Sequence, residues 1–188
     1  MRKVIIDLGT GDGRFIYNNA LKNPDDLYIG IDPSEKQMKI YAKKAKRKKL
    51  ENIQFLVGSV DVLPKELKDS ADELYIRFPW GSLLENVVKP TPEFIQKLQS
   101  ITKVHPYLEI VFGYEKQSEP SEVRRMDLPE LDENYIRKNI IPVFEKGLSL
   151  PGSLEILDKS KLKALTSTWG KKLAFGQNRP IFRIILTK

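Results

Sequence analysis

The 188-residue sequence contains no cysteine and only one histidine, His105. Without cysteine the chain can form neither disulfide bonds nor thiolate zinc sites, and we expect no bound metal. No apolar run approaches the roughly 20 residues of a membrane-spanning helix, and the N-terminus lacks a secretory signal pattern. These absences predict a cytoplasmic protein without a membrane partner. His105 precedes Pro106 at the start of a predicted strand, and we expect it to have a structural role.

The composition is that of a water-soluble globular chain, with 40% hydrophobic and 30% charged residues. This length predicts one domain, residues 1–188, with a sizeable core. Lysine and arginine outnumber aspartate and glutamate by 32 to 25, which gives a net charge of +7. A basic balance by itself is weak evidence, but in a nucleoside-binding fold it favours a nucleic-acid partner.

Residues 4–14, VIIDLGTGDGR, are the most informative stretch of the chain. An apolar run ends in an acidic residue and three glycines, and a second apolar run, residues 27–31, ends in Asp32. A strand, a glycine loop, a helix, a strand and an acidic residue in this order build a nucleoside-binding half-site. Asp32 follows the first glycine, Gly9, at the distance at which a carboxylate can take both ribose hydroxyls. An ordinary glycine turn between a strand and a helix is the simpler interpretation.

The glycine spacing helps to choose the ligand. A dinucleotide-binding loop reads G-x-G-x-x-G, whereas here the sixth position is Arg14 and the third glycine comes one residue early, at Gly13. The pattern G-x-G-x-G, with Asp7 two residues before the first glycine, resembles motif I of the class I S-adenosylmethionine-dependent methyltransferases. This cosubstrate has no phosphate, so the loop only has to pack against its amino acid and its sugar.

Strand-like runs alternate with helical patterns along the chain, which predicts a mostly parallel sheet. The predicted strands are residues 3–8, 27–32, 53–58, 73–78, 107–114, 154–157 and 181–187. The predicted helices are residues 13–23, a helix capped by Ser34 that runs to Lys49, a helix with Thr91 as N-cap and Pro92 in its first position, and residues 132–146 and 159–175. Residues 115–131 are predicted to be an irregular excursion, and Pro142 is predicted to kink its helix or end it early. The fold class is α/β: a Rossmann-like methyltransferase sheet of seven strands with an antiparallel last strand.

The turn after the fourth strand reads Phe78-Pro79-Trp80-Gly81. In this fold the turn borders the transferred methyl group and the target atom, at the carboxyl edge of the sheet. Methyltransferases that act on exocyclic amines usually carry Asn or Asp before the proline, and here neither is present. The turn therefore favours a ring nitrogen, which needs positioning and stacking rather than a general base. The alternative is that Trp80 simply closes the core.

The second of the two tryptophans, Trp169, lies among several cations in a basic, apolar-striped segment. An aromatic ring beside cations is a platform for a flipped base next to RNA phosphates, and two tryptophans could sandwich one base. The alternative is a core tryptophan on an amphipathic helix.

From residue 3 to its end the chain resembles the 16S ribosomal RNA (adenine(1408)-N(1))-methyltransferases, which modify the decoding site and confer aminoglycoside resistance. The resemblance is carried by residues 6–14, 28–33 and 78–85, by Trp169 and Lys171, and by residues 173–176 and Arg179.

The resemblance implies roles for individual residues and a 16S rRNA substrate within the 30S subunit, bound by a monomer. The cosubstrate S-adenosylmethionine, with S-adenosylhomocysteine as product, would be held by Asp7, Gly9, Gly11, Asp32, Val60, Asp61 and Pro79. Trp80 and Trp169 would sandwich the flipped adenine, with Pro79 shaping the pocket by its carbonyl. The RNA contacts near this adenine would come from Ser167, Lys171, Lys172 and Arg179.

The chain departs from the family at several positions. It lacks the N-terminal extension that usually forms a hairpin against rRNA. In the tail, an arginine of the family is replaced by Lys172, and another basic position of the family is Gln177 here. Lysine can replace arginine as a charge but not as a bidentate fork, so weaker docking to the ribosome is expected.

Residues 36–49 carry the densest positive charge of the chain. Lys39, Lys43 and Lys46 fall on one face of the predicted helix, next to Arg47. The corresponding stretch of the family faces rRNA, so we expect phosphate contacts and a steep salt dependence. A solvated helix face is the simpler interpretation of such a charge run.

Two alternative functions remain open from the sequence. A tRNA guanine-N7 methyltransferase has a similar glycine loop and a Phe-Pro…Trp turn, but it normally carries an Asp in the turn and a Thr-Asp after the fifth strand. Here the fifth strand ends in residues 112–115, FGYE. A catalytically silent rRNA-binding protein that keeps the fold is the other alternative.

Overall fold

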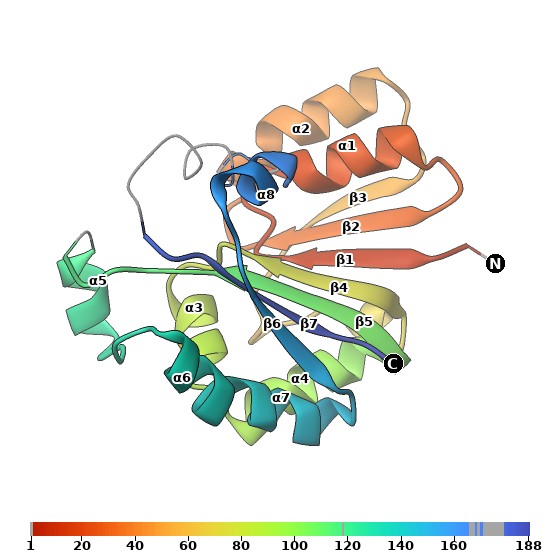
Figure 1. Cartoon of the computed structure of the whole chain (residues 1–188). Coiled ribbons are helices and arrows are strands. Elements are labelled where there is room, and N and C mark those ends of the chain that lie inside the picture. Colours follow the sequence, from red (N-terminus) through yellow and green to blue (C-terminus); the bar gives the residue numbers. More distant parts are fainter. Residues whose placement is uncertain (1, 118, 166–167, 169, 171–178) are drawn as a thin grey trace.

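The computed structural model describes residues 2–117, 119–165, 168, 170 and 179–188. A twisted sheet of seven strands, in the order β3-β2-β1-β4-β5-β7-β6, forms its centre (Figure 1). The strands are β1 (Val4–Leu8), β2 (Leu27–Asp32), β3 (Ile53–Val57), β4 (Ala71–Arg77), β5 (Thr102–Phe112), β6 (Gly152–Ile156) and β7 (Phe182–Leu186). β7 runs antiparallel to both of its neighbours, and the other pairs are parallel. The predicted fold class is confirmed.

Helices cover both faces of this sheet (Figure 1). One face carries α1 (Arg14–Lys22), α2 (Glu35–Arg47) and the short α8 (Lys159–Ala164). The other face carries α3 (Ser82–Val88), α4 (Pro92–Ile101), α6 (Glu133–Tyr135), the π-helical turn η2 (Ile136–Ile140) and α7 (Ile141–Leu148). The 3-10 turn η1 (Lys65–Leu67) and α5 (Pro120–Arg125) lie in connections. The core fills the space between the sheet and α4 and α7, where Phe94 meets Phe144 edge-on.

Two helix starts agree with the local sequence signals. The Ser34 hydroxyl accepts a hydrogen bond from the Gln37 amide at the start of α2. The Thr91 hydroxyl accepts one from the Phe94 amide 3.2 Å away, and Pro92 takes the first position of α4, where its missing N–H costs nothing.

Several predictions of secondary structure were wrong. β5 begins at Thr102 rather than at residue 107, because Thr102 already pairs with Ala71. Residues 115–131 are not wholly irregular, since they contain α5, and α3 was not predicted.

The helices predicted for residues 132–146 and 159–175 are both interrupted in the structure. Pro142 was predicted to kink its helix or end it early. The π-helical turn η2 precedes α7 there, because proline cannot donate the backbone hydrogen bond of a regular turn. The helix predicted for residues 159–175 is interrupted: α8 ends at Ala164 and Leu165 has an extended backbone, whereas Thr168 and Gly170 are helical again. Among the described helices, none has the length and apolarity that crossing a membrane requires.

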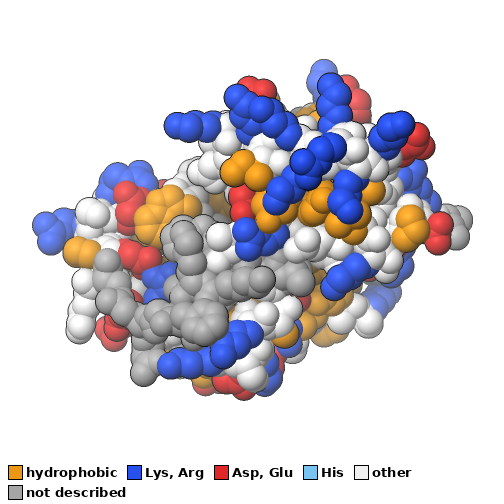
Figure 2. All heavy atoms as spheres, turned by 90° about the horizontal axis from the view of Figure 1, so that it is seen from above, with side chains coloured by type: hydrophobic (Ala, Val, Ile, Leu, Met, Phe, Trp, Pro, Cys, Tyr) orange, Lys and Arg blue, Asp and Glu red, His pale blue; other side chains and the backbone are white. Residues whose placement is uncertain are grey.

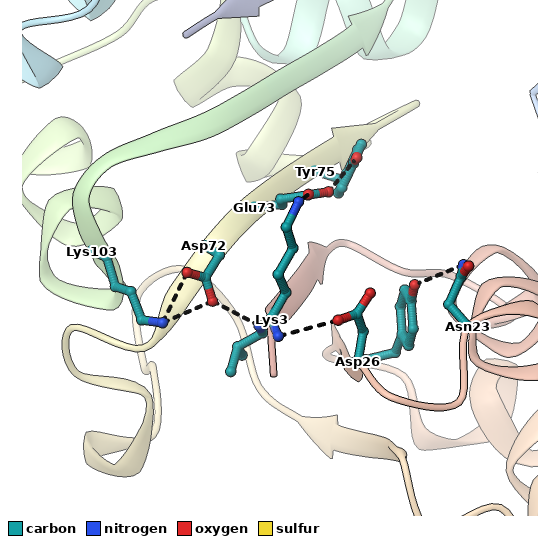
Figure 3. A network of polar contacts seen from close by, with 9 residues as sticks. Lys3, Asn23, Asp26, Asp72, Glu73, Tyr75 and Lys103 are labelled. Atoms are coloured by element: carbon teal, nitrogen blue, oxygen red, sulfur yellow. Dashed lines mark hydrogen bonds and ion pairs between the residues drawn. The ribbon is translucent and has the colours of Figure 1, made fainter. Parts of the chain in front are cut away.

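Ion pairs connect the amino ends of neighbouring strands (Figure 3). The Lys3 ammonium contacts Glu73 at 2.9 Å, and the Lys3 amide donates to Asp26. The Lys103 ammonium lies 2.8 and 2.9 Å from the two oxygens of Asp72. These pairs join the starts of β1, β4 and β5.

Candidate functional site

A cavity of about 590 Å³ opens at the opposite edge, where the carboxyl ends of β1, β2 and β4 meet. Its walls come from four stretches: residues 7–12, 32–34, 58–60 and 77–83. Further wall residues are Phe15, Gln37, Gly113, Glu119, Thr168 and Arg179. The carboxyl edge of a parallel sheet is where ligands bind in open α/β folds.

The glycine loop after β1 forms the floor of this cavity. Gly9 has a φ of 78°, and a Cβ there would lie 2.7 Å from the Leu83 side chain. The amides of Gly9 and Thr10 both donate to the carbonyl of Ile31, at 2.8 and 3.0 Å. A left-handed backbone and a crowded position require glycine here, and the loop is fixed to the end of β2.

Asp32 ends β2 beside this loop. One of its oxygens accepts a hydrogen bond from the Gly11 amide at 2.8 Å, and the other accepts one from the Ser34 amide at 2.8 Å. An ionised carboxylate has about four acceptor positions, so each oxygen keeps capacity for a hydroxyl. Asp32 therefore fits the pair of ribose hydroxyls that the sequence assigned to it.

Asp7, in β1, is only 3% exposed. Its Oδ2 accepts the Thr10 hydroxyl at 2.6 Å, whereas its Oδ1 is buried and has no hydrogen-bond partner among the described residues. Burial raises the pKa of Asp7 from 3.8 to about 6, although the Thr10 hydrogen bond and the nearby Arg77 guanidinium oppose this rise. An unpartnered carboxylate oxygen in a cavity wall fits a cationic ligand group, such as the ammonium of S-adenosylmethionine.

Sequence reasoning missed a buried ion pair behind this wall. Arg77, the last residue of β4, lies 2.6 Å from Glu109 of β5, and its guanidinium stacks 3.9 Å above the centre of the Phe15 ring. The signal was present, because a charged residue directly follows or interrupts an apolar run in each of the two strands. Arg77 also lines the cavity, so this pair supports the turn that follows it.

The turn after β4 projects Trp80 toward solvent at the rim of the cavity. Phe78 has a φ of 51°, and its amide donates to the Val111 carbonyl at 2.7 Å. Gly81, with a φ of 59°, begins α3. Trp80 is 54% exposed and lines the cavity together with Pro79, so it does not close the core. An exposed tryptophan offers its ring to a planar ligand.

The two predicted residues after β3 are placed differently. Val60 is buried and lines the cavity. Asp61 is not among the described wall residues, and its carboxylate pairs with the Lys97 ammonium at 2.5 Å. The structure thus brings Asp7, Gly9, Gly11, Asp32 and Val60 together with Pro79 and Trp80, but not Asp61.

Of the predicted RNA contacts in the tail, Arg179 is described. Its side chain is 9% exposed, and its guanidinium forms an ion pair with Glu119 in the wall of the cavity. The free protein therefore holds this cation on a carboxylate rather than presenting it to solvent. The other predicted tail residues lie outside the described residues: Ser167, Trp169, Lys171 and Lys172.

The predicted cations of α2 are exposed: Lys39, Lys43, Lys46 and Arg47. Within the described part of the chain, none of them forms an ion pair with an acidic residue. Figure 2 shows lysine and arginine side chains spread over the face that carries α1 and α2. Lys44, by contrast, packs its ammonium 4.5 Å above the centre of the Tyr41 ring. The four predicted cations are free to contact phosphates.

No cluster of three or more metal-ligating side chains occurs among the residues that the structure describes.

Comparisons with known proteins find a matching family model and relatives that cover most of this chain. The family model described as NpmA, 16S rRNA (adenine(1408)-N(1))-methyltransferase, matches residues 1–187. An Escherichia coli 16S rRNA (adenine(1408)-N(1))-methyltransferase is 36% identical over 190 residues, which cover 97% of this chain and 85% of that protein.

Solved structures are similar over nearly the whole chain. A mutant of the corresponding enzyme from Catenulisporales acidiphilia, crystallised with cosubstrate SAM, superposes with a TM-score of 0.84 at 26% identity and covers 98% of this chain and 85% of that chain. A 30S ribosomal A1408 methyltransferase from an uncultured bacterium has a TM-score of 0.73 at 37% identity, covering 99% of this chain and 87% of that chain.

Proposed function

Because the chain belongs to the 16S rRNA (adenine(1408)-N(1))-methyltransferase family, we propose that it methylates N1 of adenine 1408 in the 30S subunit and thereby confers aminoglycoside resistance. S-adenosylmethionine is the methyl donor and S-adenosylhomocysteine the product. The observation that carries the proposal is a preformed cavity lined by a buried carboxylate, with one oxygen unpartnered among the described residues, and by an exposed tryptophan at its rim. This combination suits a cationic nucleoside next to a planar base.

The cosubstrate is held by the carboxyl ends of the first three strands. Asp32 accepts the ribose hydroxyls, and the free oxygen of Asp7 accepts the ammonium. Gly9 and Gly11 let the backbone approach the amino acid portion, and the Val60 backbone borders the adenine. For Asp61 to take the adenine amino group, its ion pair with Lys97 has to open.

The target adenine leaves its stack and enters between Trp80 and Trp169. When bound, S-adenosylmethionine supplies an electrophilic methyl group on its sulfonium. Adenine N1 carries a lone pair, so this chain's residues need only orient the ring, and the Phe-Pro-Trp turn accordingly has no Asn or Asp. The stacking rings and the Pro79 carbonyl hold the base in line, which is the effect of proximity and orientation.

Docking to the ribosome uses the basic surfaces of the chain. The exposed cations of α2 contact phosphates, and the tail adds Ser167, Lys171, Lys172 and Arg179. Arg179 exchanges Glu119 for a phosphate when RNA binds. The protein acts as a cytoplasmic monomer on 16S rRNA.

The proposal is tested by incubating purified 30S subunits with labelled S-adenosylmethionine and mapping the product by reverse transcription. A stop at adenine 1408, with 30S subunits preferred over naked rRNA, is the expected result. A raised aminoglycoside tolerance of cells that express the protein would accompany it.

Other outcomes contradict the proposal in distinct ways. Label in bulk tRNA alone would support the guanine-N7 alternative. Calorimetric binding of S-adenosylmethionine without any transfer would indicate a silent rRNA-binding protein.

A further inference from the structure

Thr168 and Asp12 are 156 positions apart in the sequence, yet they share a hydrogen bond. The Thr168 hydroxyl donates to Asp12 Oδ2 at 2.6 Å. This length is within the normal range of O–H···O hydrogen bonds. Both residues line the cavity. The bond therefore connects the C-terminal part of the chain with the glycine loop.

The Asp12 side chain is itself fixed to the loop. Its other oxygen, Oδ1, accepts the Arg14 amide at 3.0 Å, in the first turn of α1. The neighbouring Gly11 amide donates to Asp32, and the Gly13 amide donates to the Thr10 carbonyl at 3.0 Å. Thr168 is thus bonded to a carboxylate whose position depends on the same loop that forms the floor of the cavity.

Thr168 immediately precedes Trp169, one of the two tryptophans proposed to stack on the target base; Trp169 lies outside the described residues. We propose that Asp12 and Thr168 are a positioning pair, which sets the start of the tryptophan-bearing segment relative to the cosubstrate loop. Neither residue needs to touch the base or the methyl group. This inference rests on the proposed function, since it assigns the pair a role in the same reaction.

A positioning role predicts a particular split of kinetic effects. Thr168→Val keeps the shape of the side chain and removes the hydroxyl, so we expect kcat on 30S subunits to fall about tenfold, the scale of one lost hydrogen bond to a charged group. The dissociation constant of S-adenosylmethionine should stay within about twofold, because Asp7, Asp32 and the loop backbone remain. Thr168→Ser keeps the hydroxyl and should recover most of the rate.

A double-mutant cycle separates the pair from general damage. Asp12→Ala also removes the contact to the Arg14 amide, but this loss is common to both arms of the cycle. In the Asp12→Ala background, Thr168→Val should have no further effect on kcat. Additive losses would overturn the proposal, as would equal losses in Thr168→Val and Thr168→Ser, or a loss of cosubstrate affinity as large as the loss of rate.

A second readout does not depend on activity. In a Trp80→Phe background Trp169 is the only tryptophan, so its fluorescence reports on this segment alone. Addition of S-adenosylhomocysteine should change its emission, and Thr168→Val should reduce that change at saturating ligand, because the bond that ties the segment to the loop is lost. Emission that ignores the ligand, or responds equally in both variants, would overturn the inference. If the parent protein fails to methylate 30S subunits, the proposed function fails while this measurement still decides on the pair.

Discussion

Asp72 and Asp7 lie at opposite ends of the parallel strands, and their pKa values are shifted in opposite directions. At the amino end, burial alone would raise the pKa of Asp72, yet the hydrogen bonds from Lys103 and from the Val4 amide lower it overall. At the carboxyl end, burial raises the pKa of Asp7 to about 6, and one of its oxygens has no partner among the described residues.

The difference between Asp72 and Asp7 is one of pairing. A paired carboxylate contributes to the fold, whereas a buried one without a full set of partners costs stability until a ligand supplies the missing group. Strongly perturbed carboxylates in clefts are for this reason candidates for binding sites. The predictions below test this contrast with matched variants at the two ends.

The largest effect is expected from the rim of the cavity. Trp80→Ala removes an exposed ring that we propose stacks on the base, and methylation of 30S subunits should fall by roughly 100-fold or more, from lost stacking and lost orientation. S-adenosylmethionine affinity, measured by calorimetry, should stay close to normal. Val104→Ala is the control, because Val104 is an 85% exposed apolar residue near the amino end of β5. Full activity of Trp80→Ala would contradict the sandwich.

The second prediction compares two aspartates. Asp7→Asn should weaken S-adenosylmethionine binding by about tenfold or more, because a charged partner of the ammonium is lost. At pH 8 the unfolding free energy of this variant should be about 1–3 kcal/mol higher than that of the unchanged protein, because the variant does not bury a charged carboxylate.

Asp72→Asn at the amino end should do the reverse. It should lower the unfolding free energy by about 1 kcal/mol, because the partly exposed pair with Lys103 is lost, and leave cosubstrate affinity unchanged. Denaturant titrations measure the unfolding free energy of both variants, and calorimetry measures their affinity for S-adenosylmethionine. Equal behaviour of the two variants would remove the contrast between the ends.

The third prediction concerns pH. The folded-state pKa of Asp7 is raised, so the folded protein holds a proton that the unfolded chain has lost between about pH 4 and 6. The stability contributed by Asp7 therefore falls as the pH rises through this window, and the penalty is complete above it. Cosubstrate affinity should change in the opposite direction, falling about tenfold from pH 7 to pH 5 as the carboxylate is protonated. Asp7→Asn should bind with a flat profile over this range, where the ligand's ammonium stays charged.

The smallest effect is expected on α2. Lys39→Ala should weaken 30S binding a few-fold and reduce the slope of log affinity against log salt by about 1, if Lys39 contacts one phosphate. Lys22→Ala, an exposed lysine at the end of α1 on the amino side of the sheet, is the matched control. Equal slopes for both variants would indicate that the cations of α2 are solvated and do not contact phosphates.

Much of the site was predictable because its signals are local. The acidic residue, the three glycines and Asp32 belong to a single strand-loop-helix-strand unit, and β2 was predicted with its observed ends. The caps of α2 and α4 follow from hydrogen bonds within four residues. The Phe-Pro-Trp turn was informative because a proline, an aromatic residue and a glycine in sequence leave few backbone choices.

Other features were not predicted from the sequence because they depend on partners far away in the chain. The early start of β5 follows from its pairing with Ala71, and α5 lies in a polar stretch with little periodicity. The resemblance placed Asp61 beside the cosubstrate, but Lys97 on α4 draws its carboxylate into an ion pair. Arg179 looked like a free cation until Glu119 was found beside it.

By itself, the sequence determined the class of the fold, and it predicted a nucleoside-binding loop and a ring nitrogen as the target atom, because each of these follows from residue types at short spacing. Only the tertiary structure decided which charges are available to a ligand. Burial and pairing are properties of the assembled sheet. Among the described residues they leave one Asp7 oxygen without a partner, hold Arg179 on Glu119 and bond Thr168 to Asp12.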